Sequence, residues 1–180
     1  MKKLIIVAIG SIIATGVMAK TAGFQASLSP DIAVEDPDTR INGVSLNIWG
    51  ENPQSALTLG FVNGSTGESK GVSVGLFNYA ENYAGFHWGF VNYTRGEFAG
   101  LQMGPVNIAG TLNGVQLGWV VNIARELSGV QVSWVNYAST VHSGVQVGLV
   151  NIIADNSWFS DFPSDLAMGM VFVNWSFGGK

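Results

Sequence analysis

The chain has 180 residues, of which 47% are hydrophobic and 11% charged, and it has no cysteine and a formal charge of −4. The lack of cysteine excludes disulfides, thiolate metal sites and a lipoprotein anchor. An acidic chain without a basic cluster is a poor partner for nucleic acid, because neutralisation of phosphates dominates such binding. Soluble domains usually carry about 25% charged residues, so this composition is unusual for a soluble secreted protein.

Residues 1–19 have the pattern of a secretory signal peptide. Lys2 and Lys3 precede an uncharged apolar stretch that ends in small residues before Ala19. A retained membrane helix is the weaker alternative, because the stretch is shorter than the ~20 residues that a span needs. Cleavage after Ala19 leaves residues 20–180 as one repeat-built β domain, with six basic and twelve acidic residues and a charge near −6.

The rest of the chain consists of about ten copies of one short unit. The clearest copies are Gly-Val-Gln-Val-Ser-Trp-Val-Asn at 129–136 and Gly-Val-Gln-Val-Gly-Leu-Val-Asn at 144–151. Such a short period has to be interpreted before any other feature, because it decides the class of fold. In chain order, the units begin near residues 24, 44, 57, 71, 85, 100, 114, 129, 144 and 168.

Within each unit, small or polar residues alternate with large apolar ones, which is the signature of a β-strand. Turn-forming pairs such as Asn113-Gly114 separate the units. One position of each unit forms a polar row, with the members Gln25, Ser45, Thr58, Ser73, His87, Gln102, Gln116, Gln131 and Gln146. The pattern therefore predicts an all-β fold of short strands.

Two architectures suit this repeat. A β-solenoid stacks its coils in parallel, whereas an up-and-down barrel joins antiparallel strands alternately at its two ends. From each member of the polar row to the next, with Gly169 taken as the last, the distance along the sequence is 20, 13, 15, 14, 15, 14, 15, 15 and 23 residues. The two long distances are the first and the ninth, so both fall in the odd-numbered set. Long loops on one side are typical of outer-membrane barrels. We predict a small antiparallel β-barrel of about ten strands, with a β-solenoid of 14–15-residue coils as the alternative.

In the predicted barrel, the polar row faces the lumen and the large apolar residues face lipid. The candidate lipid-facing residues are Trp88, Phe90, Trp119, Trp134, Leu149 and Phe172. Because ten strands enclose little more than their own side chains, an open pore is not expected. The expected partners are outer-membrane lipid and the barrel-insertion machinery.

The repeat Gly-Val-Gln-x-Gly-x-Val-Asn, complete at 144–151 and with Ser133 for the second glycine at 129–136, resembles a family of bacterial envelope proteins described by their surface repeat. The resemblance covers most of residues 43–152. It implies a location at the surface or in the outer membrane, and it brings no substrate, cofactor or catalytic residue. Residues 170–177 also resemble the aromatic-ended strand that barrel-insertion machinery recognises, although Gly178-Gly179-Lys180 follows them.

Catalytic and metal sites have little support in the sequence. His87 lies in the polar row and His142 in a turn, without a clustered partner, and the recurring asparagines are expected to bond neighbouring backbone. We therefore expect no enzyme, cofactor or metal site. The first hypothesis is an outer-membrane barrel with a structural, adhesive or weakly conducting role. The alternative is a surface-exposed β-solenoid that binds a partner, and the distant alternative is a barrel enzyme.

Overall fold

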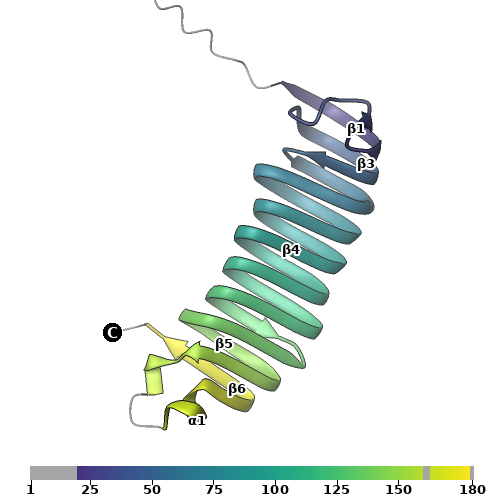
Figure 1. Cartoon of the computed structure of the whole chain (residues 1–180). Coiled ribbons are helices and arrows are strands. Elements are labelled where there is room, and N and C mark those ends of the chain that lie inside the picture. Colours follow the sequence, from purple (N-terminus) through teal and green to yellow (C-terminus); the bar gives the residue numbers. More distant parts are fainter. Residues whose placement is uncertain (1–19, 160–162, 179–180) are drawn as a thin grey trace, which may run out of the picture.

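The computed structural model describes residues 20–159 and 163–178, which form a β-solenoid, a stack of short coils (Figure 1). The expected signal peptide, residues 1–19, lies outside the described residues. The elements in chain order are β1 (Thr21–Ser29), β2 (Ile32–Ala33), β3 (Arg40–Asn52), β4 (Ser55–Val132), β5 (Val135–Asp155), the 3-10 helix η1 (Ser157–Phe159), α1 (Ser164–Met168) and β6 (Gly169–Phe177). The 78 residues of β4 stay extended while they pass through several coils.

Neighbouring coils run in the same direction, so that like residues stack on like. β1 pairs with β3, β3 with β4 and β4 with β5, and all three pairings are parallel. Gln131 lies beside Gln146, and Asn122 beside Asn136, so the repeat unit is in register between coils. Antiparallel pairing occurs only at the two ends among the named pairings, where β2 pairs with β1 and β6 with β5.

The predicted antiparallel barrel is therefore wrong, whereas the all-β class is confirmed and the alternative, a β-solenoid, fits. The two long distances between members of the polar row do not come from outer loops of a barrel. The first contains β2, which folds back on the first coil, and the last contains η1 and α1, which lead into the antiparallel strand β6. A solenoid needs distinct end units to cover its terminal coils. Both long steps are odd-numbered because they are the first and last of nine.

The interior of each coil is thin and holds a polar part, rich in amide side chains, and an apolar part. Its apolar part is a stack of alanines and single larger residues contributed by successive coils. Its members are Ala80, Tyr83, Phe98, Ala109, Leu112, Ala124, Leu127, Ala138, Val141 and Ile153. Four coils each contribute an alanine and one larger residue, as at Ala109 and Leu112, which fills this space without widening the coil, since protein interiors are close-packed.

Glycines mark the position at which each coil starts. Gly71, Gly85, Gly100, Gly114 and Gly129 have φ between 121° and 147°, a conformation that other residues rarely adopt. A Cβ at Gly100 would also clash with the carbonyl oxygen of Gly85 in the previous coil. The recurring glycine of the sequence is therefore required both by the backbone conformation and by the close approach of the coils.

Candidate functional site

The polar row predicted from the sequence lies in the interior of the coils and not along a lumen. Each of its nine members, Gln25, Ser45, Thr58, Ser73, His87, Gln102, Gln116, Gln131 and Gln146, is at most 1% exposed. Four of the glutamines form a hydrogen-bonded ladder along the stack. The Nε2 of Gln116, Gln131 and Gln146 each donates to the Oε1 of the glutamine one coil earlier, at 2.8, 2.7 and 2.8 Å.

A second ladder consists of eight asparagines, Asn47, Asn63, Asn78, Asn92, Asn107, Asn122, Asn136 and Asn151. The Nδ2 of each of the first seven donates to the Oδ1 of the next asparagine, at distances from 2.8 to 3.1 Å. Most also donate to a backbone carbonyl of the next coil, as Asn92 does to Met103 at 2.9 Å. The asparagines thus bond backbone, as expected from the sequence, but the ladder between side chains was missed because it requires parallel coils.

The asparagine ladder explains the second recurring glycine of the motif. A Cβ at Gly89 would come within 2.6 Å of the Asn78 Nδ2 and of the Gly75 carbonyl oxygen. The residue at this position points inward, and the amide of the preceding coil occupies the space that a side chain would need. We call the positions Gly60, Gly75, Gly89, Gly104, Gly118, Ser133 and Gly148 the small-residue row.

His87 occupies the polar-row position one coil before the glutamine ladder begins, and it lies in an aromatic pocket. Its ring centroid is 4.1 Å from that of Tyr83 and 5.0 Å from that of Phe98. Within the described residues, neither ring nitrogen of His87 has a hydrogen-bond partner. Burial lowers the pKa of His87 to about 3, so the imidazole is neutral at physiological pH. The other histidine, His142, is exposed and lies 3.5 Å from Glu126, so the two do not form one site.

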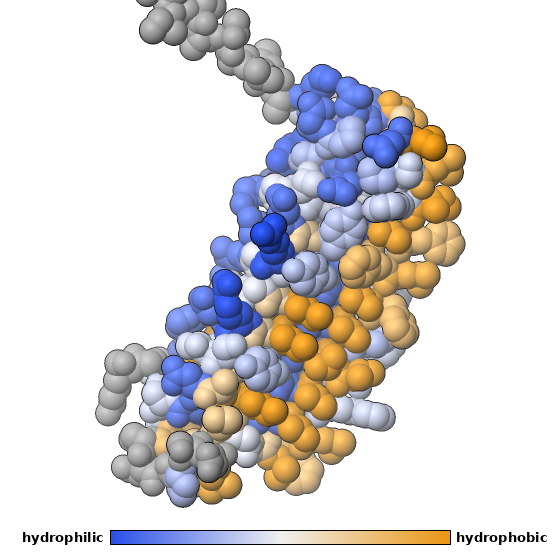
Figure 2. All heavy atoms as spheres, in the orientation of Figure 1, coloured by the Kyte–Doolittle hydropathy of each residue, from blue (hydrophilic) through white to orange (hydrophobic). Residues whose placement is uncertain are grey.

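Outward-pointing residues of the first half of each coil form a continuous apolar surface, which we call the apolar face. It contains three rows, defined by their place relative to the small-residue row. Row A is Leu57, Val72, Phe86, Leu101, Val115, Val130 and Val145; row B is Leu59, Val74, Trp88, Met103, Leu117, Val132 and Val147; row C is Phe61, Leu76, Phe90, Pro105, Trp119, Trp134 and Leu149. Figure 2 shows these hydrophobic side chains gathered along one side of the stack.

The residues predicted to face lipid lie on the outside of the solenoid. Phe90, Trp119, Trp134 and Leu149 belong to row C, and Trp88 belongs to row B. Row C residues other than Pro105 are the most prominent, with exposed fractions between 57% and 67%. Phe172, at 70% exposed, lies on β6 beside Gly148 and has a positive φ of 68°. The structure thus brings the first five together on one face and places Phe172 at its C-terminal end.

A groove runs along the apolar face between rows B and C. Its floor is the small-residue row from Gly60 to Gly104, and its walls are Leu59, Val74 and Trp88 on one side and Phe61, Leu76, Phe90 and Trp119 on the other. Its volume is about 710 Å³. A second hollow of about 650 Å³ adjoins it at the N-terminal end, where β2 folds back, and shares Asn47, Leu59 and Gly60 with it.

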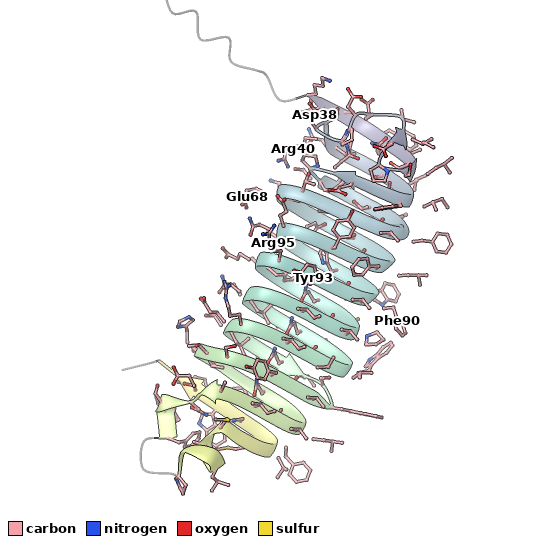
Figure 3. All side chains as sticks on the ribbon, viewed as in Figure 1. Asp38, Arg40, Glu68, Phe90, Tyr93 and Arg95 are labelled. Atoms are coloured by element: carbon pink, nitrogen blue, oxygen red, sulfur yellow. The ribbon has the colours of Figure 1, made fainter. Side chains whose placement is uncertain are left out.

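Several charged residues lie on the edge opposite to the apolar face. In Figure 3, Arg40, Glu68 and Arg95 project from the edge opposite to Phe90. Asparagine and glutamate side chains link the turns there: the Asn82 Nδ2 donates to Glu68 at 2.8 Å, and the Asn113 Nδ2 donates to Glu97 at 2.7 Å. No described charged residue belongs to rows A, B or C. The solenoid is therefore amphipathic across its width.

Comparison with known proteins gave no significant match to a family model, a curated protein or a solved structure. Among residues 20–159 and 163–178, no helix has the length and apolar character needed to cross a membrane. In the same residues, no three His, Asp or Glu side chains are grouped as metal ligands would be. The apolar face is a surface feature of the described residues that the fold itself does not require.

Proposed function

We propose that this chain is an exported protein of the bacterial cell envelope that acts as an interaction module and binds its partner through the apolar face. The observation that carries the proposal is the continuity of rows A, B and C over seven coils, with no charged side chain among them. Apolar patches larger than a few hundred Å² are rare on monomeric soluble proteins and mark interaction sites. Export is an expectation from residues 1–19.

The thin interior does not account for this face. A narrow coil explains why Trp88, Trp119 and Trp134 lie outside, but threonine, a polar residue that is also enriched in strands, would suit the same outward positions. Each large apolar side chain left in water forgoes about 1.5–3 kcal/mol that burial would contribute. Repeating such residues in every coil is consistent with a partner that covers them.

The chemistry of the face supports binding and not catalysis. Rows A, B and C contain no side chain with a nucleophile, a general acid or a general base, which bond-making sites require. We interpret the polar ladders as structural, because their amides are buried and bond one another. His87 lacks a route to solvent, since it is 1% exposed.

Cell fractionation tests the proposal. The full chain with residues 1–19 is expressed in a Gram-negative host, and the variant Phe90→Ser/Trp134→Ser is compared with the control Tyr93→Ser/Tyr137→Ser. Each double variant removes two aromatic rings from the same two coils, and only the first pair lies on the apolar face. We expect the wild type and the control in the membrane-associated envelope fraction and the Phe90/Trp134 variant in the soluble periplasmic fraction.

The fractionation would contradict the proposal if a correctly folded Phe90/Trp134 variant stayed with the envelope as the wild type does. Circular dichroism of the purified variants shows whether each is folded. Because both side chains are more than 60% exposed, their removal is expected to leave the β-sheet signal unchanged.

A further inference from the structure

We infer that the partner of the apolar face is the surface of a phospholipid bilayer, with lipid acyl chains lying in the groove between rows B and C. This inference rests on the proposed function and names the partner. The solenoid would then lie flat on one leaflet, with its charged edge in water and without crossing the membrane. Interfacial attachment of this kind scales with the apolar area that enters the boundary between headgroups and acyl chains.

The groove has the shape and chemistry of a site for an unbranched apolar chain. It follows the stacking direction from Leu59 to Trp119, which spans roughly 20 Å at the ~4.8 Å spacing of neighbouring strands. Its floor is glycine and its walls are apolar, and Asn47 at one end is its single polar lining residue. Small-molecule and sugar sites need convergent polar groups to fix orientation, and this groove does not supply them.

The backbone of the face argues against an extended peptide that would add to the sheet as a further strand. Extended peptides add to sheets through unpaired N–H and C=O groups at an edge. On the apolar face these groups take part in the parallel pairings between coils, as between Val130 and Val145 and between Val132 and Val147. What the face offers is therefore side-chain contact, for which hydrocarbon is sufficient.

The tryptophans distinguish a bilayer surface from a second copy of this chain. Trp49, on β3 and outside rows A, B and C, donates its indole N–H to the Tyr79 hydroxyl at 3.1 Å. Burial raises the pKa of Tyr79 to about 12, so this hydroxyl stays protonated, and it donates to Glu51 at 2.7 Å. Within the described residues, Trp88, Trp119 and Trp134 have no such partner for their indole N–H groups.

Pairing two apolar faces would bury these indole N–H groups without acceptors, which is costly. At a bilayer surface the rings enter the apolar boundary while the N–H groups reach lipid carbonyls, phosphates and water, and tryptophan is enriched there for that reason. The aromatic residues of the face thus fit a partner that is apolar at depth and wet at its surface.

The charge distribution specifies how the protein would bind. The face has no basic residue to attract anionic headgroups, and the expected mature chain has a charge near −6. Binding should therefore depend on apolar burial, prefer zwitterionic lipid and change little with salt, in contrast to attachment through basic clusters.

Flotation with phosphatidylcholine vesicles tests the inference. The purified full-length mature chain, residues 20–180, is mixed with vesicles and the bound fraction is measured at 50 and 500 mM salt. We expect the wild type and Tyr93→Ser/Tyr137→Ser to bind at both salt concentrations, and Phe90→Ser/Trp134→Ser to bind at least tenfold more weakly. Val74→Glu, which places a carboxylate in the middle of the groove, is expected to lose binding by at least the same factor.

A second readout locates the contact. Vesicles with brominated acyl chains should quench the tryptophan fluorescence of the wild type. In Trp158→Phe, which removes a tryptophan outside the face in η1, the quenched fraction of the fluorescence should be larger than in the wild type. If the wild type fails to float and sediments as a dimer that Phe90→Ser/Trp134→Ser dissociates, the lipid inference is overturned while the apolar face remains an interaction surface. If the wild type and all variants float equally, both the inference and the proposed face are wrong.

Discussion

Amide side chains have an unusual role in this protein, because they fill the interior of a solenoid whose tryptophans lie outside. A buried amide is stabilising only when its hydrogen-bonding groups are paired. Stacking identical residues at the coil spacing meets this condition, since each Asn Nδ2 finds the Oδ1 of the next coil. The two ladders point in opposite directions along the stack: asparagines donate toward the C-terminus and glutamines toward the N-terminus. Their side-chain dipoles therefore oppose one another.

Replacement of Asn107 by alanine tests the ladder. Asn107 accepts from Asn92 and donates to Asn122 and to the carbonyl of Leu117. Asn107→Ala removes all three bonds, and we expect a loss of several kcal/mol in the free energy of unfolding, at roughly 1–3 kcal/mol for each buried group left unpaired. Asn113→Ala, which removes one exposed bond to Glu97, is the control and should cost less than about 0.5 kcal/mol. Equal effects of the two in urea unfolding would refute a stabilising ladder.

The buried histidine predicts a pH dependence of stability. The pKa of His87 is about 3 in the folded chain, below its value of 6.5 in the unfolded chain. The unfolded state therefore takes up a proton first, so the contribution of His87 to stability is constant above about pH 6.5 and falls as the pH is lowered toward 3, by up to about 1.4 kcal/mol per pH unit.

His87→Gln should remove this part of the pH dependence. It should also add one glutamine to the ladder, one coil before Gln102. The measurement is the difference between wild type and variant in urea midpoint at pH 7.5 and pH 4.5. The wild type should lose more stability than the variant over this interval, whereas parallel losses would show that His87 is protonated in the folded state.

At the level of the element, the coil is defined by two glycine positions and by the alternation between them. The first glycine of each unit turns the chain, and the second leaves room for the asparagine of the neighbouring coil. The large apolar residues between them point outward because strand residues alternate in direction. A reading of the sequence gives this alternation, but it cannot show that the second glycine faces a side chain from another unit.

Gly100→Ala tests the requirement for glycine at the start of a coil. The residue has φ of 136° and would place its Cβ against the carbonyl oxygen of Gly85. We expect a loss of at least about 2 kcal/mol, since strained backbone alone costs about 1–3 kcal/mol. Gly23→Ala is the matched control, because nothing lies within 4 Å of its Cβ position, and its midpoint in thermal unfolding should be unchanged or slightly raised. A Gly100→Ala protein that is as stable as the control would contradict the assigned geometry.

At the level of the whole molecule, stability is distributed along the stack, because each coil contacts only its neighbours. The ends differ from the middle: β2 covers the first coil, and β6 pairs with the last one in the antiparallel direction. Covered ends limit further pairing of strands with other chains. The apolar face runs the length of the stack and does not depend on either end.

Deletion of one entire coil, residues 114–128, tests this organisation. The deletion joins Asn113 to Gly129 and so keeps the Asn-Gly junction of the sequence. Removing one unit from an antiparallel fold would reverse the direction of every later strand, whereas removal from a parallel stack only shortens it. We expect a folded monomer with unchanged β-sheet circular dichroism per residue and a lower unfolding midpoint. Failure to fold, while Asn113→Ala folds, would argue against independent parallel coils.

The sequence alone determined the repeat, its period of 14–15 residues and the alternation that separates the polar row from the large apolar residues. It also predicted the all-β class. It did not determine the direction of the strands, because alternation and turn residues look the same in parallel and antiparallel neighbours.

Only the tertiary structure decided that question. Parallel coils place the amides of Gln102, Gln116, Gln131 and Gln146 beside their copies one coil away, so these buried side chains bond one another and need no lumen. The same stacking turns the two longest connections, at residues 31–39 and 156–168, into the ends of a solenoid. Pairing between residues 15 positions apart is a property of the folded stack, and for that reason neither composition nor local pattern contains it.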